Sequence, residues 1–407
     1  MKQTLCVPTL WRKATLQDLV YFQRGFDITK AEQKEGNVPV ISSSGVTSFH
    51  FKAMATGPGV IIGRKGTLGT VYFSESDYWP HDTTLWSKDL KGNYPRFVYY
   101  FLQTLGLDHY NVGNANPTLN RNHIHGLKIR IPPLNTQTQI ADVISAYDNL
   151  IDNNRKRIQL LEESARLLFR EWFVYFRFPL RLRSGQAGHG KVHPVRKSNS
   201  NGVKIVDGMP EGWKKGSIKD LSKVRSGYAF DSSDWLDEGN PVIKIGNITG
   251  DGTVNLDDCS YIDQNVASRA KDFALKKGDL LIAMTGATVG KVGLLSENAK
   301  TAYLNQRVGK FIPRFEGSEL VLYCFFMSDT AQNHITNYAG GAAQANISAS
   351  QIESIKIVVA PQDIYNQFIS LIKSTFEQIL NLRNQNQKLA QARDLLLPRL
   401  MSGAIEV

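Results

Sequence analysis

The chain has 407 residues, of which 42% are hydrophobic and 10% aromatic, which suits roughly two to three domains with buried cores. Its three cysteines, Cys6, Cys259 and Cys324, lack metal-like spacing, which argues against a disulfide framework and favours a reducing compartment. The first ten residues do not resemble a signal peptide, and the longest apolar run, 320–327, is too short to span a bilayer. These features exclude the secreted and membrane classes, and we expect a cytoplasmic protein.

The net charge of +11 favours a polyanionic partner. However, residues 177–219 carry ten Lys or Arg and only two acidic residues, so this stretch supplies +8 of the total. The rest of the chain is only weakly basic. Overall charge is therefore weak evidence that the folded domains bind nucleic acid.

In chain order, a β-rich, Gly-punctuated domain is predicted first, over 1–134, with strands at 60–62, 70–73 and 127–131 and a short helix at 97–105. A long helix follows over 135–177. Residues 178–210 are basic and rich in Gly, Ser and Asn, which is typical of a flexible linker. A basic arm that touches phosphates is the alternative for this linker.

A second β-rich domain is predicted over 211–361, with strands at 280–283, 308–312 and 355–359 and a short helix at 319–327. A second long helix follows over 362–399 and is expected to close at Pro398. Residues 400–407 form a tail.

The two halves repeat one another. Trp11, Asp18 and Gly25 recur as Trp213, Asp220 and Gly227, at an offset of 202 that still holds at Ile41 and Ile243. Towards the end of each domain the offset is 228, as between Pro133 and Pro361. The pattern predicts a duplicated domain with extra residues inside the second copy, and it suggests a target with two related halves.

Both long helices carry an apolar heptad seam, and each seam contains one Asn, a residue that commonly fixes helix register. Two matched seams favour antiparallel pairing of the helices with each other, although each helix packing only on its own domain is the alternative. The seam residues that we expect to pair are Ile144, Ile151, Asn154, Leu161, Leu168, Trp172, Ile372, Ile379, Leu382, Asn386, Leu389 and Leu396.

Catalytic and metal-binding patterns are not recognisable. Asn116-Pro117-Thr118 lacks the second proline and the aromatic residue of an amino-methyltransferase motif. The segment 286–292 resembles a phosphate loop, but it is one residue short and has Val292 where Ser or Thr would hold magnesium. His123 and His125 have no third metal ligand in view. We expect neither catalysis nor a bound metal.

Gly-rich loops at 63–69 and 284–291 each follow an apolar strand and permit close approach of a ligand. Their basic side chains suit phosphates or guanine edges, but ordinary turns with solvated charges explain them equally well. Amide-rich loops at 113–122 and 340–348 suit adenine, with turn formation as the alternative. Scaffold positions match between the repeats whereas loop positions differ, as expected for two readers of different targets.

This layout resembles the DNA-specificity subunit of type I restriction–modification enzymes. The resemblance is carried by the Trp-x-Lys entrance at Trp11 and Trp213, the Gly-type loop after a strand, and the Leu/Ile-x-Ile exit through Pro133 or Pro361 into a heptad helix. It implies an α+β fold in which two β-rich target-recognition domains are separated by two long antiparallel coiled-coil helices, with pseudo-two-fold duplication. The basic linker is longer than the family's usual bridge.

The resemblance further implies that each domain reads one half of a bipartite double-stranded DNA site, while the helices set the spacer and dock two methyltransferase subunits. Those subunits would recruit motor-nuclease subunits, and S-adenosylmethionine, ATP and Mg²⁺ would bind to these partners rather than to this chain. A coiled-coil scaffold that binds only proteins is the alternative. The expected DNA contacts are Arg64, Lys65, Thr67, Asn114, Asn116, Asn120, Arg121, Thr285, Thr288, Lys291, Gln344, Asn346 and Ser348.

Overall fold

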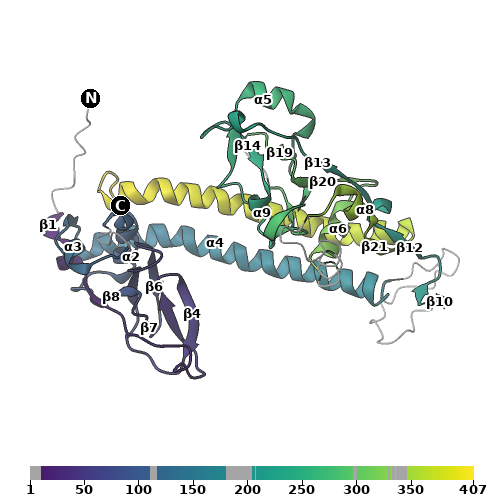
Figure 1. Cartoon of the computed structure of the whole chain (residues 1–407). Coiled ribbons are helices and arrows are strands. Elements are labelled where there is room, and N and C mark those ends of the chain that lie inside the picture. The colour runs from purple at the N-terminus through teal and green to yellow at the C-terminus, as the bar shows by residue number, and fades with distance from the viewer. Residues whose placement is uncertain are drawn as a thin grey trace. The chain divides into compact units, whose positions relative to one another are not determined.

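The chain folds into two compact units (Figure 1). The first consists of residues 1–152 with 387–407, and the second of residues 153–386. Each contains one β-rich domain and a segment of both long helices, so the predicted α+β class is confirmed. The computed structural model describes residues 11–110, 117–179, 204–206, 208–296, 300–328, 331, 335 and 346–407. Most of the predicted linker, including residues 180–203, lies outside them.

The first domain is built on two small sheets and a strand pair. A four-stranded antiparallel sheet has the order β2-β8-β5-β6, and a three-stranded sheet has the order β4-β3-β7, in which β3 and β7 are parallel. The strand β1 pairs with β9. The bounds are β1 Arg12–Thr15, β2 Tyr21–Arg24, β3 Val38–Ser42, β4 Gly45–His50, β5 Gly59–Gly63, β6 Val71–Ser74, β7 Trp79–Pro80, β8 Thr84–Asp89 and β9 Lys128–Ile131.

The second domain repeats this topology with one added strand. Its larger sheet has the order β13-β20-β17-β18-β15, its smaller sheet the order β16-β14-β19 with β14 and β19 parallel, and β12 pairs with β21. The bounds are β12 Lys214–Ser217, β13 Ser222–Ser226, β14 Asn240–Ile243, β15 Gly252–Thr253, β16 Ser260–Ile262, β17 Leu280–Ala283, β18 Val292–Leu294, β19 Tyr303–Leu304, β20 Val308–Pro313 and β21 Lys356–Val359. A separate hairpin, β10 Ile205–Val206 with β11 Met209–Pro210, precedes it.

Short helices complete both domains. They are α1 Leu16–Leu19, α2 Pro95–Gln103 and α3 Arg121–His125 in the first, and α5 Gln264–Arg269, α6 Ser318–Phe326 and α8 Ala349–Ser354 in the second, together with several 3₁₀ turns. The predicted strands and the helices near 97–105 and 319–327 are therefore confirmed within a few residues.

The structure locates the extra residues of the second copy. Ile41 and Ile243 still differ by 202, whereas Ile62 of β5 and Ile282 of β17 occupy equivalent positions and differ by 220. Most of the added length therefore lies between β14 and β17, where the second domain carries β15 and α5.

The two long helices are α4, Leu134–Phe169, and α9, Gln362–Met401. A π-helical turn at Arg170–Val174 continues α4, so helical structure ends three residues before the expected residue 177. The prediction that Pro398 closes the second helix is wrong. Proline removes a backbone donor and crowds the carbonyl four residues earlier, but Leu397, Leu400 and Met401 are buried in the core of the first unit, which favours one further turn.

In each unit the two helix segments contact one another and run antiparallel. In the second unit, Asn154 donates its side-chain N–H to Asn386 Oδ1 at 3.0 Å, and the Phe169 and Phe368 ring centroids lie 6.2 Å apart. Leu397 and Leu400 of α9 share the core of the first unit with Ile140 and Ile144 of α4. Each pair also packs on its own domain, so pairing of the helices is confirmed and packing on the domain alone is not the arrangement.

A tyrosine–carboxylate–arginine triad ties each domain to its helix segments. In the first unit, Tyr100 of α2 donates to Asp148 Oδ2 at 2.6 Å, and Arg393 Nη1 donates to Asp148 Oδ1 at 2.7 Å. In the second, Tyr323 of α6 donates to Glu162 Oε1 at 3.0 Å, and Arg383 Nη2 to the same oxygen at 2.6 Å. In both units the acid lies on α4 and the arginine on α9.

The second triad is the more deeply buried one. The side chains of Arg383 and Glu162 are 8% and 14% exposed, whereas those of Arg393 and Asp148 are 30% and 25% exposed. Burial raises the pKa of Glu162 even though the Arg383 charge opposes this shift. In the described part of the chain, no helix combines the length and the apolar character needed to cross a membrane.

Candidate nucleic-acid interface

In both domains, the Gly-rich loop and the end of the amide-rich loop lie side by side. An isolated bridge joins Lys65 to Thr118 in the first domain, and an equivalent bridge joins Thr285 to Asn346 in the second. Leu119 N–H donates to the Arg64 carbonyl at 2.9 Å, and Ile347 N–H donates to the Met284 carbonyl at the same distance. The two loops singled out in each repeat are therefore brought together by the same backbone contacts.

A third loop, which the sequence analysis missed, completes the arrangement. It connects β7 to β8 through residues 81–83 and β19 to β20 through residues 305–307. Arg64 N–H donates to the Thr83 carbonyl at 2.8 Å, and Met284 N–H donates to the Arg307 carbonyl at 3.0 Å. The third loop thus lies against the Gly-rich loop in both domains.

The repeated glycines Gly25 and Gly227 explain how this loop is held. A Cβ added at Gly25 would lie 2.1 Å from the His81 carbonyl oxygen, and one at Gly227 would lie 2.3 Å from the Asn305 carbonyl oxygen. Only glycine permits such an approach. These glycines were the available signal for the third loop, but a sequence does not say which segment a glycine approaches.

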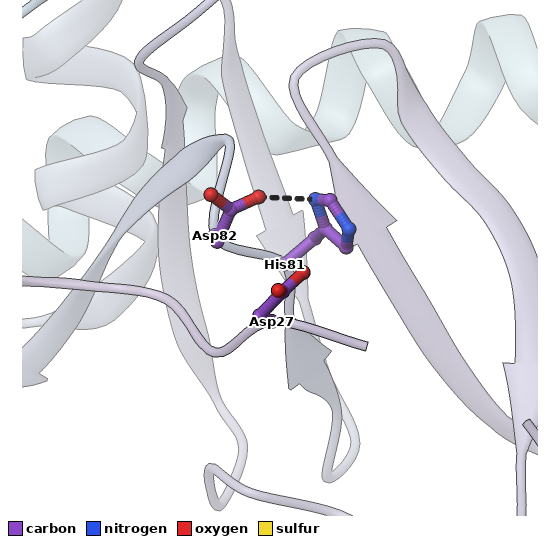
Figure 2. Close-up of side chains that lie close together, drawn as sticks. All are labelled: Asp27, His81 and Asp82. Carbon is purple, nitrogen blue, oxygen red and sulfur yellow. Dashed lines mark ion pairs between the residues drawn. The ribbon is translucent and has the colours of Figure 1, made fainter. Parts of the chain in front are cut away.

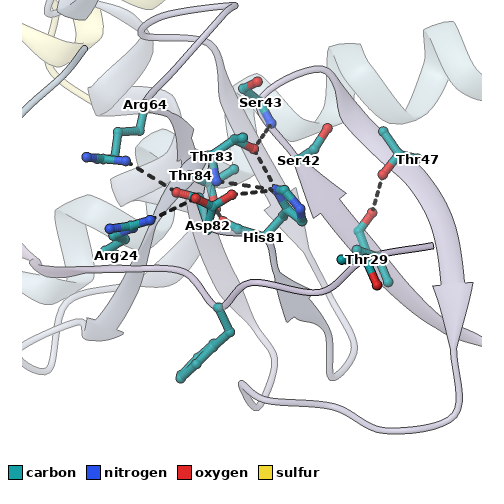
Figure 3. A network of polar contacts seen from close by, with 12 residues as sticks. Arg24, Thr29, Ser42, Ser43, Thr47, Arg64, His81, Asp82, Thr83 and Thr84 are labelled. Atoms are coloured by element: carbon teal, nitrogen blue, oxygen red, sulfur yellow. Dashed lines mark hydrogen bonds and ion pairs between the residues drawn. The ribbon is translucent and has the colours of Figure 1, made fainter. Parts of the chain in front are cut away.

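Figure 3 shows the polar side chains that gather around this loop in the first domain. Arg24, at the end of β2, places Nη2 2.8 Å from Asp82 Oδ2, and Arg64 donates from Nη1 to the Asp82 carbonyl at 3.5 Å. Partial burial, followed by the nearby Arg24 charge, lowers the pKa of Arg64 below its ordinary value. Two arginines therefore converge on one carboxylate-bearing residue.

On the other side of the loop, His81 is oriented by its neighbours. Thr83 N–H donates to His81 Nδ1 at 3.3 Å, and the Thr83 hydroxyl, which accepts from Ser43 N–H at 3.2 Å, lies 3.0 Å from the same nitrogen. The same nitrogen lies 3.2 Å from Asp82 Oδ1, so Nδ1 is enclosed by polar groups of Thr83 and Asp82. Figure 2 shows the His81–Asp82 pair, with the other ring nitrogen, Nε2, pointing away from Asp82.

Asp27, His81 and Asp82 also form a group whose ligand atoms lie within 4.8 Å of one another (Figure 2). Such a group has the composition of a metal site. However, Asp82 already pairs with Arg24 and with His81 Nδ1, and the same nitrogen lies 3.3 Å from Thr83 N. Since the guanidinium charge opposes a cation at this carboxylate, the group fits a hydrogen-bonding surface better than a metal centre.

The second domain presents different chemistry on the equivalent backbone. Asn305 Oδ1 accepts from Arg307 N–H at 3.3 Å, and Gln306 and Arg307 are exposed. Lys244, at the position of Ser42, lies 3.6 Å from the centroid of the Trp235 ring and donates to Ser260 Oγ at 2.7 Å. This domain therefore displays amide and basic groups where the first displays an arginine–aspartate pair.

The structure places the predicted contact residues in three groups. Lys65, Thr67, Asn120, Asn346 and Ser348 are exposed, whereas Arg64, Arg121, Thr285, Thr288 and Lys291 are half-buried. Asn114, Asn116 and Gln344 lie outside the described residues.

Two predicted contact residues have a structural explanation. Asn120 Oδ1 accepts from Asn122 N–H at 3.0 Å and caps α3. Ser348 Oγ accepts from Gln351 N–H at 3.2 Å and caps α8. Because these caps account for both side chains, we do not retain Asn120 and Ser348 as candidate base contacts.

Within the described residues, Thr285 Oγ1 is a buried hydroxyl without a hydrogen-bond partner. It belongs to the Gly-rich loop of the second domain and sits on the bridge to Asn346. A buried polar atom without a hydrogen-bond partner costs folding free energy. The loops of the second domain therefore meet at a hydroxyl whose hydrogen-bonding capacity is unused by the described residues.

Most of the predicted seam residues are buried against the opposite helix or the adjoining domain, including Ile144, Ile151, Asn154, Trp172 and Ile379. Such residues are not accessible to a partner protein. The outward faces of the helices instead expose leucines, namely Leu150, Leu160, Leu167, Leu371 and Leu395.

Comparison with known proteins supplies the remaining evidence. Residues 8–163 and 210–391 match the sequence model of the family described as the type I restriction modification DNA specificity domain. The chain is 23% identical over 425 residues to the MjaVIII type I restriction enzyme specificity subunit of Methanocaldococcus jannaschii. This match covers 99% of this chain and 95% of the relative. It is 26% identical over 335 residues to the HindI specificity subunit of Haemophilus influenzae, covering 71% of each.

Among solved structures, the chain is similar to the S subunit of a type I restriction–modification system from M. genitalium. The TM-score is 0.61 at 14% identity, and the match covers 98% of both chains. This similarity concerns the fold.

Proposed function

The chain belongs to the type I restriction–modification DNA specificity family, and from this premise we propose that each β-rich domain reads one half of a bipartite double-stranded DNA site. The observation that carries the proposal is the repeated three-loop arrangement. The loops share their backbone hydrogen bonds between the domains but differ in their side chains. Such a surface suits recognition of two different base sequences, because base edges differ in their donor and acceptor patterns.

We further propose that the helix pair sets the distance between the half-sites. Asn154–Asn386 in the second unit and the triads of both units hold α4 and α9 in one register. An Asn within a helix seam is a known device for fixing register. A helix pair with a fixed register has a fixed length, which is the property that a ruler requires.

The exposed leucines of α4 and α9 support a third part of the proposal, in which the outer faces of the helices dock two methyltransferase subunits. Motor-nuclease subunits would join through them. This chain has a non-catalytic role, so methylation with S-adenosylmethionine and cleavage with ATP and Mg²⁺ would take place on these partners.

The direct test of DNA reading is selection from a library of randomised duplexes, using the full chain together with the methyltransferase subunits from the same genome. We expect enrichment of two short fixed sequences separated by an unread spacer. Binding should weaken as salt rises, because phosphate contacts release counterions. Binding without any bipartite preference would contradict the proposal.

The ruler is tested by inserting seven residues into α4 after Asp152 and seven into α9 after Asn386. One heptad preserves the seam and adds about 10 Å, the length of roughly three base pairs. We expect a longer tolerated spacer with unchanged half-sites. The matched control inserts seven residues into α4 alone, which puts the Asn154–Asn386 and Asp148–Arg393 contacts out of register with each other and should abolish defined spacing.

A scaffold that binds only proteins is the second candidate, and the exposed leucines are the observation that favours it. Replacing Leu160 and Leu371 with Gln would separate the two. If DNA recognition is the function, the variant should lose methyltransferase subunits but keep its half-site preference. A scaffold would show no half-site preference before or after the change.

A further inference from the structure

We infer that the third loops, residues 81–83 and 305–307, are base-reading elements, and that Arg24, held by Asp82, reads a guanine in the half-site of the first domain. The inference rests on the proposed function and adds to it the residues that read and one base that is read.

Arg24 is pre-oriented for such a contact. One edge of its guanidinium is fixed by Asp82 Oδ2 at 2.8 Å, while its side chain remains 55% exposed and that of Asp82 is 17% exposed. A guanidinium fork can donate two parallel hydrogen bonds to O6 and N7 of guanine. Fixing the fork beforehand reduces the conformational freedom that binding would remove.

The groups around this pair agree with that assignment. Arg64 lies on the Asp82 carbonyl rather than on its carboxylate, so the carboxylate remains available to orient Arg24. His81 Nδ1 lies 3.2 Å from Asp82 Oδ1 and helps to fix the carboxylate that holds Arg24. Two arginines meeting at one loop match the acceptors of guanine and of the adjoining phosphates.

The second domain supports the assignment because a serine stands at the position of Arg24. Ser226, paired with Gly309, occupies the position that Arg24, paired with Leu85, occupies in the first domain. No guanidinium can be presented from there. Its third loop instead exposes Gln306, whose amide carries the donor and the acceptor that adenine requires. The two loops therefore have one backbone geometry and different base preferences.

A simple connecting loop would explain the backbone contacts but not the side chains. A three-residue connection from β7 to β8, or from β19 to β20, needs no particular polar side chains. The first domain nevertheless has an arginine held by an aspartate there, and the second has exposed amide and basic groups. The shared geometry with divergent polar chemistry is the observation that points to reading.

The test uses the full chain with its methyltransferase subunits and a library of randomised duplexes. Arg24→Lys keeps the charge and the pairing with Asp82 but removes the fork. We expect the preference for guanine at one position of the first half-site to fall roughly 5- to 150-fold, the range for one bidentate contact. Asp82→Asn, which releases Arg24, should weaken the same position.

Gln306→Glu provides the reciprocal arm, because it replaces the amide donor with an acceptor and should alter one position of the second half-site. Each variant is thus the control for the other domain. Asp89→Asn, at an exposed ion pair of the first domain, and Gln264→Glu, on α5, are matched controls that should change neither half-site.

The outcomes are distinguishable. Uniformly weaker binding with unchanged base preference and a shallower salt dependence would identify Arg24 as a phosphate contact and overturn the inference. Unchanged selection by all three variants would also overturn it, while leaving the proposed function intact. If the unaltered chain selects no bipartite site, both the inference and the proposed function are contradicted. Thermal unfolding of Arg24→Lys, which alters a mostly exposed side chain, checks that the fold is retained.

Discussion

Where β7 meets β8, the first domain places His81, Asp82 and Thr83; where β19 meets β20, the second places Asn305, Gln306 and Arg307. The backbones around these residues make the same hydrogen bonds to the Gly-rich loop, and each is approached by the glycine that directly follows β2 or β13. Backbone contacts do not depend on side chains, so the loop can change its chemistry without losing its position. The comparison shows how one scaffold can address two different DNA sequences.

The units differ in a second respect, the burial of the triad that ties each domain to the helices. Arg383 and Glu162 are more enclosed than Arg393 and Asp148. If burial decides how strongly a domain is fixed to its helix segments, the second domain is held more firmly than the first.

The largest expected effect tests this difference. Arg383→Met leaves Glu162 buried without its cation and should reduce the free energy of unfolding by about 3–5 kcal/mol. Arg393→Met, the matched change in the first unit, should cost about 1–2 kcal/mol because water still reaches Asp148. Hydrogen exchange resolved by unit measures both. Equal costs would show that burial does not distinguish the triads.

The next effect concerns the Asn pair of the second unit. Asn154→Leu leaves the Asn386 amide without its partner and should cost about 1–3 kcal/mol. The double change to Leu at both positions should recover most of this loss, giving a coupling energy of about 0.5–3 kcal/mol in denaturant unfolding. Asn153→Leu, at an exposed neighbouring position, is the control and should show no coupling to Asn386.

The caps of α3 and α8 occupy equivalent positions and predict a smaller effect. Ser348→Ala and Asn120→Ala should each cost about 1 kcal/mol in thermal unfolding, because a capped backbone donor is lost. Exchanging the caps, Asn120→Ser with Ser348→Asn, should be nearly neutral. The base preference should stay unchanged in all of them, and a changed half-site would restore these residues as DNA contacts.

The smallest effect is a pH dependence of the first unit that arises from His125. His125 Nε2 accepts from Phe22 N–H at 3.1 Å, and burial, followed by the Arg121 charge, lowers the pKa of His125 below 6.5. The unfolded chain therefore binds the proton first, so stability should fall as pH drops below about 6.5 and level off above it. Hydrogen exchange of the first unit at several pH values measures this dependence.

The equivalent acceptor in the second unit is Glu353, which takes Val224 N–H at 2.7 Å. The second unit has no imidazole at this position, so it should lack the contribution that His125 makes to the first unit. His125→Gln keeps a neutral acceptor and should flatten the profile of the first unit. A profile that persists in this variant would assign it to another group.

Much of this arrangement is predictable from the sequence because the chain repeats itself. The matching tryptophans, glycines and exit prolines predicted the duplicated domain, and the heptad seams predicted the helix pairing in which Asn154 meets Asn386. The Gly-rich and amide-rich loops were predicted individually, and the structure brings them together.

Other parts were not predictable, for physical reasons. Residues 81–83 and 305–307 share no side chain, so identity between the repeats could not reveal them. Asn and Ser serve equally as helix caps and as base readers, so Asn120 and Ser348 were ambiguous until their hydrogen bonds were known. Pro398 indicated a helix end, but burial of Leu400 and Met401 favours a further turn.

The central claim is that the two domains read separate half-sites on one shared scaffold. Exchanging residues 35–120 for the equivalent segment of another family member, followed by duplex selection, tests it most directly. The account predicts that one half-site changes while the other half-site and the spacer stay the same. A change in both half-sites would contradict it, because the domains would then not be independent readers.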